Sequence, residues 1–99
     1  MNVSVNKSGE VYEINIDGVI KSVADSQSIK DAINSCDGTA PITLDITNSF
    51  SITSSVIGFL LKKVQADKRS IRINAHDSRL YDLFQTLNLT QTLNVHKAG

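Results

Sequence analysis

Alternating apolar and polar residues predict a β-hairpin in the first part of the chain. Val3 and Val5 alternate with polar neighbours, and a second alternating run over residues 11–16 follows the turn signal at Ser8 and Gly9. A period of two places the apolar side chains on one face of a strand. Two such runs joined by a short turn that contains glycine are typical of a hairpin, so we expect an antiparallel strand pair here.

Three later segments have the apolar spacing of amphipathic helices. The first spans about Ser22 to Cys36, and its Ser22 and Asp25 have the spacing of a capping box. The second follows a polar stretch over residues 48–55, and the third is capped at residue 77 or 78. Apolar residues cover more of the second helix, so we expect it to be the most buried of the three. The apolar stripes are Ile29, Ala32, Ile33 and Cys36; Val56, Ile57, Leu60, Leu61 and Val64; and Leu80, Leu83, Phe84 and Leu87.

Three further strands separate and follow these helices. Alternating apolar residues predict them at Ile42–Ile46, Ile71–Ile73 and Leu93–Val95. The element order is then β-β-α-β-α-β-α-β, and strands joined through a helix form right-handed parallel crossovers. We therefore predict a single α/β domain over residues 1–99, with a small and mostly parallel sheet, an antiparallel N-terminal hairpin, and helices packed against the sheet.

Composition and charge narrow the classes of protein to which the chain can belong. The 99 residues fit one domain, 40% of them are hydrophobic, and ten Lys and Arg balance ten Asp and Glu. A neutral chain lacks the basic excess that supplies most nucleic-acid affinity, so no nucleic-acid partner is expected. The longest apolar run, Val56–Leu61, is far shorter than the roughly 20 residues that span a bilayer, which predicts no direct membrane insertion. No secretory signal is visible and the single cysteine forms no internal disulfide, so we expect a cytoplasmic protein.

The residues that most often carry catalysis are scattered along the chain. His76 and His96 have no metal-ligand motif beside them, and Cys36 ends an apolar helical stripe, which is typical of a small core residue. Asp77 and Asp82 flank the start of the third helix, where carboxylates favour the helix dipole. The sequence contains no glycine-rich phosphate loop of either common type. We therefore expect no enzyme activity, no catalytic residue, no cofactor and no bound metal.

The most informative segment is the hydroxyl-rich stretch that joins the strand Ile42–Ile46 to the second helix. Thr53, Ser54 and Ser55 stand together at the expected start of that helix. The first N–H groups of a helix lack partners and carry a partial positive charge, so a phosphate group there finds hydrogen-bond donors. One of these hydroxyls would cap the helix in any protein, so a purely structural role and a functional role both fit the residues.

The same segment resembles the STAS domain, the fold of bacterial anti-sigma-factor antagonists and related regulatory modules. In that family, a strand with the pattern apolar-Leu-Asp-apolar-Ser is followed, after a short loop, by apolar-Asp-Ser-Ser-Gly-Leu-Gly at the start of a helix. Residues 44–47 (Leu-Asp-Ile-Thr) fit the strand, and residues 52–58 (Ile-Thr-Ser-Ser-Val-Ile-Gly) fit the helix start. The third helix with its ending at Asn88 is also similar, and the element order agrees over essentially all 99 residues.

The resemblance implies a non-catalytic binding module for signal transduction and transcription regulation in bacteria. Ser54 falls on the phosphorylatable serine of the family, and Ser55 and Thr53 are less favoured phosphoacceptors. Such a module, when unphosphorylated, binds a serine-kinase-type anti-sigma factor or a similar regulator, and phosphorylation weakens the binding. The expected partner-binding residues are Asn48, Ser49, Phe50, Ser51, Thr53, Ser54, Ser55 and Val56.

Two positions depart from the family pattern. Thr53 replaces the acidic residue before the phosphoacceptor, and Val56 replaces the first glycine after the two serines, where a β-branched residue is expected to stiffen and thicken the helix start. The alternative is an accessory subunit of a membrane lipid-transport complex or of a stress-signalling assembly, which is not phosphorylated. In either case we expect a monomer or a weak homodimer, because free sheet edges permit a dimer without requiring one.

Overall fold

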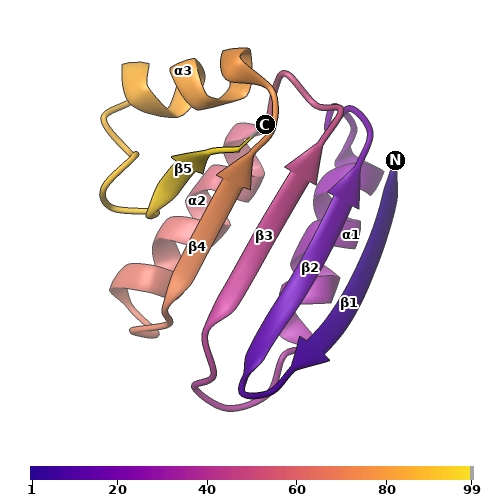
Figure 1. Cartoon of the computed structure of the whole chain (residues 1–99), viewed down its shortest axis with the longest axis vertical. Coiled ribbons are helices and arrows are strands. Elements are labelled where there is room, and N and C mark those ends of the chain that lie inside the picture. The colour runs from indigo at the N-terminus through magenta and orange to yellow at the C-terminus, as the bar shows by residue number, and fades with distance from the viewer. Residues whose placement is uncertain (99) are drawn as a thin grey trace.

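A five-stranded sheet and three helices make up the computed structural model, which describes residues 1–98 (Figure 1). The predicted α/β fold class and element order are confirmed, although the first helix ends slightly before its predicted boundary. Within the described residues, none of the helices has the length and hydropathy of a membrane span. The strands are β1 (Asn2–Ser8), β2 (Val11–Asp17), β3 (Ile42–Thr47), β4 (Ile71–Ala75) and β5 (Val95–Lys97), and the helices are α1 (Val23–Asn34), α2 (Ser54–Gln65) and α3 (Ser78–Thr86).

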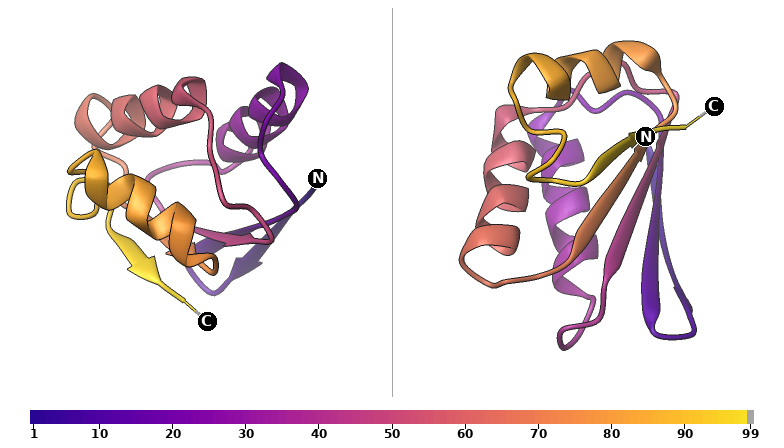
Figure 2. Two further views of the ribbon diagram at one scale, coloured as in Figure 1. Left: turned by 90° about the horizontal axis from the view of Figure 1, so that it is seen from above. Right: turned by 60° about the vertical axis from the view of Figure 1, so that its left-hand side comes forward.

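The order of the strands in the sheet is the order of the strands in the chain, β1-β2-β3-β4-β5. β1 pairs antiparallel with β2, and the other three pairs are parallel, as the hairpin and the crossover helices predict. Successive right-handed crossovers in one direction place their helices on one face of a sheet. Figure 2 shows α1 and α2 side by side over that face, while α3 crosses the end of the sheet next to β4 and β5.

The hydrophobic core lies between the sheet and the helices. Inward-facing strand residues such as Ile14, Ile16 and Leu44 are at most 1% exposed, and they form one cluster with the apolar stripes of the helices. The opposite face of the sheet is polar and open to solvent. It carries a pair in which Nε2 of His76 lies 2.8 Å from Oδ1 of Asp45. The sheet therefore has one buried face and one solvated face, which explains the strict alternation along its strands.

Polar caps fix the starts of the helices. The Ser22 hydroxyl accepts from the Asp25 N–H at 3.0 Å, and Oδ2 of Asp25 accepts from the N–H groups of Lys21 and Ser22, both at 3.1 Å. The predicted capping box is thus confirmed, and these two backbone donors lower the pKa of the Asp25 carboxyl. Asp77 caps α3, and Asn88 closes that helix with a φ of 58°, a left-handed conformation that asparagine tolerates.

Two details of the sequence prediction are wrong. α2 is not the most buried helix, because Val56 and Leu60 are its two buried residues and α1 has four. The other apolar side chains of α2 are half-buried, since its apolar arc is wider than the strip that the sheet covers. The last strand begins at Val95 instead of Leu93, because Asn94 has a φ of 51° that interrupts the extended backbone.

Candidate functional site

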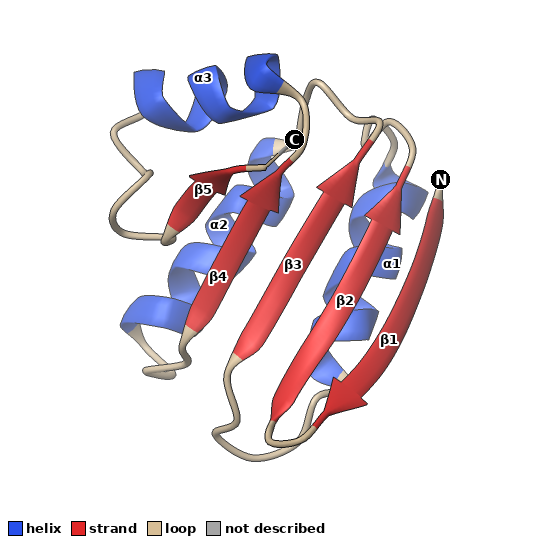
Figure 3. Ribbon diagram, in the orientation of Figure 1, coloured by secondary structure: helices blue, strands red, loops and turns tan. Residues whose placement is uncertain are grey.

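The carboxyl ends of β2, β3 and β4 lie together at one end of the sheet, where three loops lead into the three helices (Figure 3). This arrangement follows from the parallel pairing, because each crossover helix starts where its strand ends. The loops span residues 18–22, 48–53 and 76–77. The hydroxyl-rich segment forms the middle loop and the start of α2, so it lies between the other two loops.

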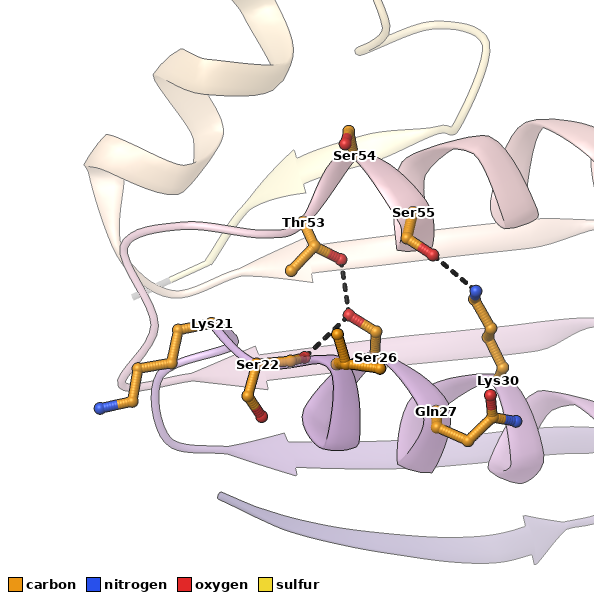
Figure 4. A pocket seen from close by; sticks show the side chains of 9 residues that line it. Lys21, Ser22, Ser26, Gln27, Lys30, Thr53, Ser54 and Ser55 are labelled. Carbon is orange, nitrogen blue, oxygen red and sulfur yellow. Dashed lines mark hydrogen bonds between the residues drawn. The ribbon is translucent and has the colours of Figure 1, made fainter.

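Thr53 is the N-cap of α2, and its hydroxyl group is fully engaged. Oγ1 of Thr53 accepts from the Val56 N–H at 3.2 Å and lies 2.8 Å from Oγ of Ser26 on α1. The Ser26 hydroxyl donates to the carbonyl oxygen of Ser22 at 3.1 Å, so Thr53 is the donor in the Thr53–Ser26 pair. One hydroxyl therefore caps α2 and also ties α2 to the first turns of α1 (Figure 4).

Ser54 and Ser55, the first two residues of α2, differ in their surroundings. Nζ of Lys30, on α1, donates to Oγ of Ser55 at 2.6 Å. Ser54 is exposed, its hydroxyl makes no hydrogen bond to any other of residues 1–98, and Figure 4 shows its side chain pointing away from Ser26 and Lys30. Of the three adjacent hydroxyls, Ser54 is the one without a hydrogen bond to the rest of residues 1–98, whereas Ser55 is exposed and accepts from Lys30.

A groove of about 180 Å³ lies between the first turns of α1 and α2, and we call it the α1–α2 groove. It has basic side chains from Lys21 and Lys30, and the N-termini of both helices add partial positive charge. Val23 lines the groove and is 87% exposed. The remaining lining residues are Ser22, Ser26, Gln27, Thr53, Ser54 and Ser55.

Hydrogen bonds between two loops hold the segment before Thr53 in place. Oγ of Ser49 accepts from the Ile20 N–H at 3.1 Å and donates to the carbonyl oxygen of Ser51 at 2.7 Å. The Ser51 hydroxyl donates in turn to the carbonyl oxygen of Ile20 at 3.3 Å. Asn48, with a φ of 58°, donates from Nδ2 to Oδ1 of Asp17 at 2.6 Å. The polar side chains of this loop therefore fix its shape against the end of β2.

An exposed aromatic ring connects this loop to the start of α3. Phe50 is 47% exposed, and the guanidinium carbon of Arg79 lies 4.9 Å from its ring centroid, within the range of a cation–π contact. Arg79 is held by Asp77, whose Oδ2 lies 2.8 Å from Nη2. Hydrogen bonds from the Arg79 side chain and backbone lower the pKa of Asp77. The site thus extends from α1 across the middle loop to α3.

The structure places the predicted partner-binding residues in two groups. Six of them have exposed or partly exposed side chains: Asn48, Phe50, Ser51, Thr53, Ser54 and Ser55. Ser49 and Val56 are 0% exposed, so the prediction that they contact a partner is wrong. Ser49 supports the loop through its hydrogen bonds, and Val56 packs in the core. The expectation that Val56 thickens the helix start is wrong for the same reason, because its side chain points inward.

Four residues of the site were missed by the sequence reasoning. Ser26 and Lys30 bond the hydroxyls of α2, Lys21 lines the α1–α2 groove, and Arg79 covers Phe50. The spacing of Ser22, Ser26 and Lys30 at i, i+4 and i+8 places polar groups along one stripe of a helix, and that signal could have identified a polar contact with α2. Arg79 carries no comparable signal in the sequence.

The cysteine and the two histidines do not contribute to this site. Cys36 is buried, and each histidine is bonded to a neighbouring side chain. Cys36 is 3% exposed, and burial raises the pKa of its thiol, which disfavours the thiolate. His76 pairs with Asp45 on the open face, and Nε2 of His96 lies 2.9 Å from Oδ1 of Asn94. No cluster of three or more His, Cys, Asp or Glu side chains within residues 1–98 is arranged to hold a metal ion.

The fold and the site define a class: a small mixed α/β protein with an exposed serine at the start of its second helix. No protein-family model matches the chain, and the curated proteins contain no match to it. The geometry of the site and the resemblance of its sequence pattern are therefore the two features that bear on function.

Proposed function

We propose that the chain is a regulatory protein-binding module of the STAS kind, acting in the cytoplasm. Its partner is a serine-kinase-type anti-sigma factor or a similar regulator, which docks on the middle loop, the start of α2 and the α1–α2 groove. Ser54 is the phosphoacceptor, and its modification weakens the docking. The module has no catalytic role of its own.

The observation that carries this proposal is the exposed hydroxyl of Ser54, which is free of hydrogen bonds to the rest of residues 1–98. Ser54 lies at the exposed start of α2 with an unengaged hydroxyl, whereas the hydroxyls of Thr53 and Ser55 are each bonded to α1. A partner kinase would transfer the γ-phosphoryl group of ATP to Oγ of Ser54 and release ADP, with the serine proton passing to a base on the kinase. Thr53 would first have to break its hydrogen bonds to Ser26 and Val56, and Ser55 is in contact with Lys30 at the surface.

The charge around Ser54 supports a switch by phosphorylation. The α1–α2 groove contains two lysines and no acidic side chain among its lining residues, and it suits an acidic surface on the partner. A phosphate adds about −1.5 to −2 charges at neutral pH, on a chain whose formal net charge is zero. The positive ends of the helix dipoles accommodate that charge within the fold, so the loss falls on the interface.

Two exposed apolar side chains support a protein as the partner. Val23 borders the α1–α2 groove and Phe50 lies on the neighbouring loop, and both present apolar surface to solvent. Apolar and aromatic groups surrounded by polar ones are common at the centres of protein–protein interfaces.

A second candidate, the unphosphorylated accessory subunit of a transport or stress-signalling assembly, is favoured by Thr53 and Val56. Both of these departures from the family pattern have complete structural roles: Thr53 caps α2, and Val56 fills the core. The start of the helix therefore needs no phosphate to satisfy its groups, and the same surface would serve as a permanent contact.

A titration of variants against the partner tests the proposal. Ser54→Ala, Ser54→Asp and Ser55→Asp would each be titrated into the partner protein that co-purifies with the chain from its own cells, and mass spectrometry of the same preparation would map the phosphosites. We expect Ser54→Ala to bind at least about tenfold more tightly than Ser54→Asp, a difference of about 1.4 kcal/mol. Ser55→Asp is the matched control, since it places the same charge next to Lys30. Equal affinity of the two Ser54 variants would contradict the switch and favour the permanent subunit.

A further inference from the structure

The outer edge of β1 is the longer of the two free edges of the sheet. β1 contains seven residues, nearly all exposed, and Figure 1 shows it at the border of the sheet with no element beyond it. The other border is β5, which has three residues and packs against α3. Proteins usually blunt an exposed edge with proline, several charges or a bulge. β1 has no proline, one charged residue, Lys7, and an unbroken register with β2.

The pairing of β2 shows which backbone groups of β1 face outward. The N–H groups of Tyr12 and Gly18 donate across to the β3 side, to Pro41 at 2.9 Å and Thr47 at 3.0 Å. The backbone N–H and C=O groups of the even-numbered residues of β2 therefore point toward β3, and those of the odd-numbered residues point toward β1. In an antiparallel ladder, bonded and non-bonded pairs alternate. The partners of the even-numbered residues are Val3, Val5 and Lys7 of β1, so the N–H and C=O groups of these three residues point away from the sheet.

We propose that β1 is a dimerisation edge, on which β1 of a second copy of this chain pairs antiparallel around a two-fold axis at Val5. The axis places Val5 opposite Val5 of the second copy and Val3 opposite its Lys7, and the reverse pair follows by symmetry. All three outward-facing residues then find a partner residue that also faces outward. The edge is thus complementary to itself, and two copies joined in this way form a continuous ten-stranded sheet.

The side chains of β1 fit the same register. On the helix-covered face, Val5 is 39% exposed and would meet its own copy, an apolar pair in contact across the axis. On the open face, Ser4 would lie opposite Asn6, and their polar groups can hydrogen-bond. Lys7 would lie opposite Val3, so no like charges face each other. A single strand pair buries less than the roughly 1,200 Å² of standard interfaces, so the dimer is weak and depends on concentration.

Complementary charges at Val5 test the register. Val5→Lys and Val5→Glu would each place two like charges against each other across the axis, whereas a mixture of the two variants would pair Lys with Glu. By sedimentation velocity over micromolar to millimolar concentrations, we expect each variant alone to dimerise at least about tenfold more weakly than the wild type. The mixture should regain the dimer, and the matched control Val5→Thr should dimerise like the wild type. Circular dichroism checks that all variants remain folded.

Amide hydrogen exchange provides a second and independent readout. The N–H groups of Val3, Val5 and Lys7 should exchange rapidly in dilute protein and more slowly as the concentration rises, while those of Ser4 and Asn6 should be protected at every concentration. A wild type that stays monomeric throughout the range would overturn the proposal. A dimer that Val5→Lys and Val5→Glu leave intact, or that their mixture does not restore, would overturn the two-fold axis at Val5.

Discussion

The hydroxyl groups of Ser26 and Thr53 lie 2.8 Å apart and join the first turns of α1 and α2. Ser26 is 5% exposed, and its side chain is one of two buried polar side chains among the described residues. The N-cap of one helix is therefore also the hydrogen-bond partner of the other, so the two helix starts that border the groove are held in a fixed relation.

Replacing Thr53 should weaken both helices at this point. We expect Thr53→Ala to lower the free energy of unfolding by about 1–2 kcal/mol, because the Val56 N–H and the Ser26 hydroxyl both lose a partner. Urea denaturation measures the change, and Thr53→Ser is the control that keeps the hydroxyl. In a double-mutant cycle with Ser26→Ala, we expect a coupling of about 0.5–1.5 kcal/mol. A Thr53→Ala variant as stable as the wild type would contradict the shared cap.

A negative charge at Ser54 should leave the fold intact and stabilise it slightly. Ser54→Asp places a carboxylate in the first turn of α2, and we expect a gain of about 0.3–1 kcal/mol in the free energy of unfolding, which decreases as salt is added. Ser54→Asn is the uncharged control of similar size. If Ser54→Asp destabilised the protein, weak binding of that variant would no longer separate an effect on the interface from an effect on folding.

The Asp25 carboxyl should make stability depend on pH in the acid range. Its pKa is lower in the folded protein than the ordinary value of about 3.8, so the ionised form stabilises the fold. This contribution is fully present above that ordinary value and is lost as the pH falls through the lowered pKa. We therefore expect the stability difference between wild type and Asp25→Asn, followed by urea denaturation, to shrink below about pH 3.8. Asp77→Asn should behave in the same way, because hydrogen bonds from Arg79 lower the pKa of Asp77.

Two substitutions in α2, on opposite sides of the helix, should have opposite effects. Val56→Gly removes a side chain that is 0% exposed and should lower the free energy of unfolding by about 3 kcal/mol, through lost burial and the low helix propensity of glycine. Gly58→Ala should raise it by about 0.5–1 kcal/mol, because a Cβ there meets nothing within 4 Å. Thermal and urea unfolding measure both. Since Val56 points inward, Val56→Gly should not make Ser54 more accessible to a kinase, and a faster phosphorylation of that variant would contradict this inward role.

The fold could be predicted from the sequence because burial repeats with a local period. Ile14 and Ile16 alternate with polar residues along β2, and the stripes of α1 and α3 follow the helical period, so each element carries its own signal. The wide apolar arc of α2 predicted more burial than the structure shows, because the width of the arc does not determine how much of it the sheet covers. The start of β5 was misplaced because the left-handed backbone of Asn94 has no signature in an alternating pattern.

The arrangement of the site depends on contacts between residues that are far apart in the chain, and the apolar periodicity of the sequence gives no information about such contacts. Thr53, Ser54 and Ser55 are all suitable caps, and the structure distinguishes them through Ser26 and Lys30, which are 27 and 25 residues away in the chain. The burial of Ser49 depends likewise on the N–H of Ile20, 29 residues earlier. The burial of a polar side chain can be predicted only when its hydrogen-bond partner is known, and a single sequence does not identify that partner.

The sequential order of the strands has a consequence for biosynthesis. A chain that leaves the ribosome completes the hairpin first, and each later strand then joins the edge of an existing sheet, so no strand has to insert between two earlier ones. Assembly can begin before the final helix has been translated. By the same logic, shortening the chain from its C-terminal side would remove strands from one border of the sheet and none from its middle.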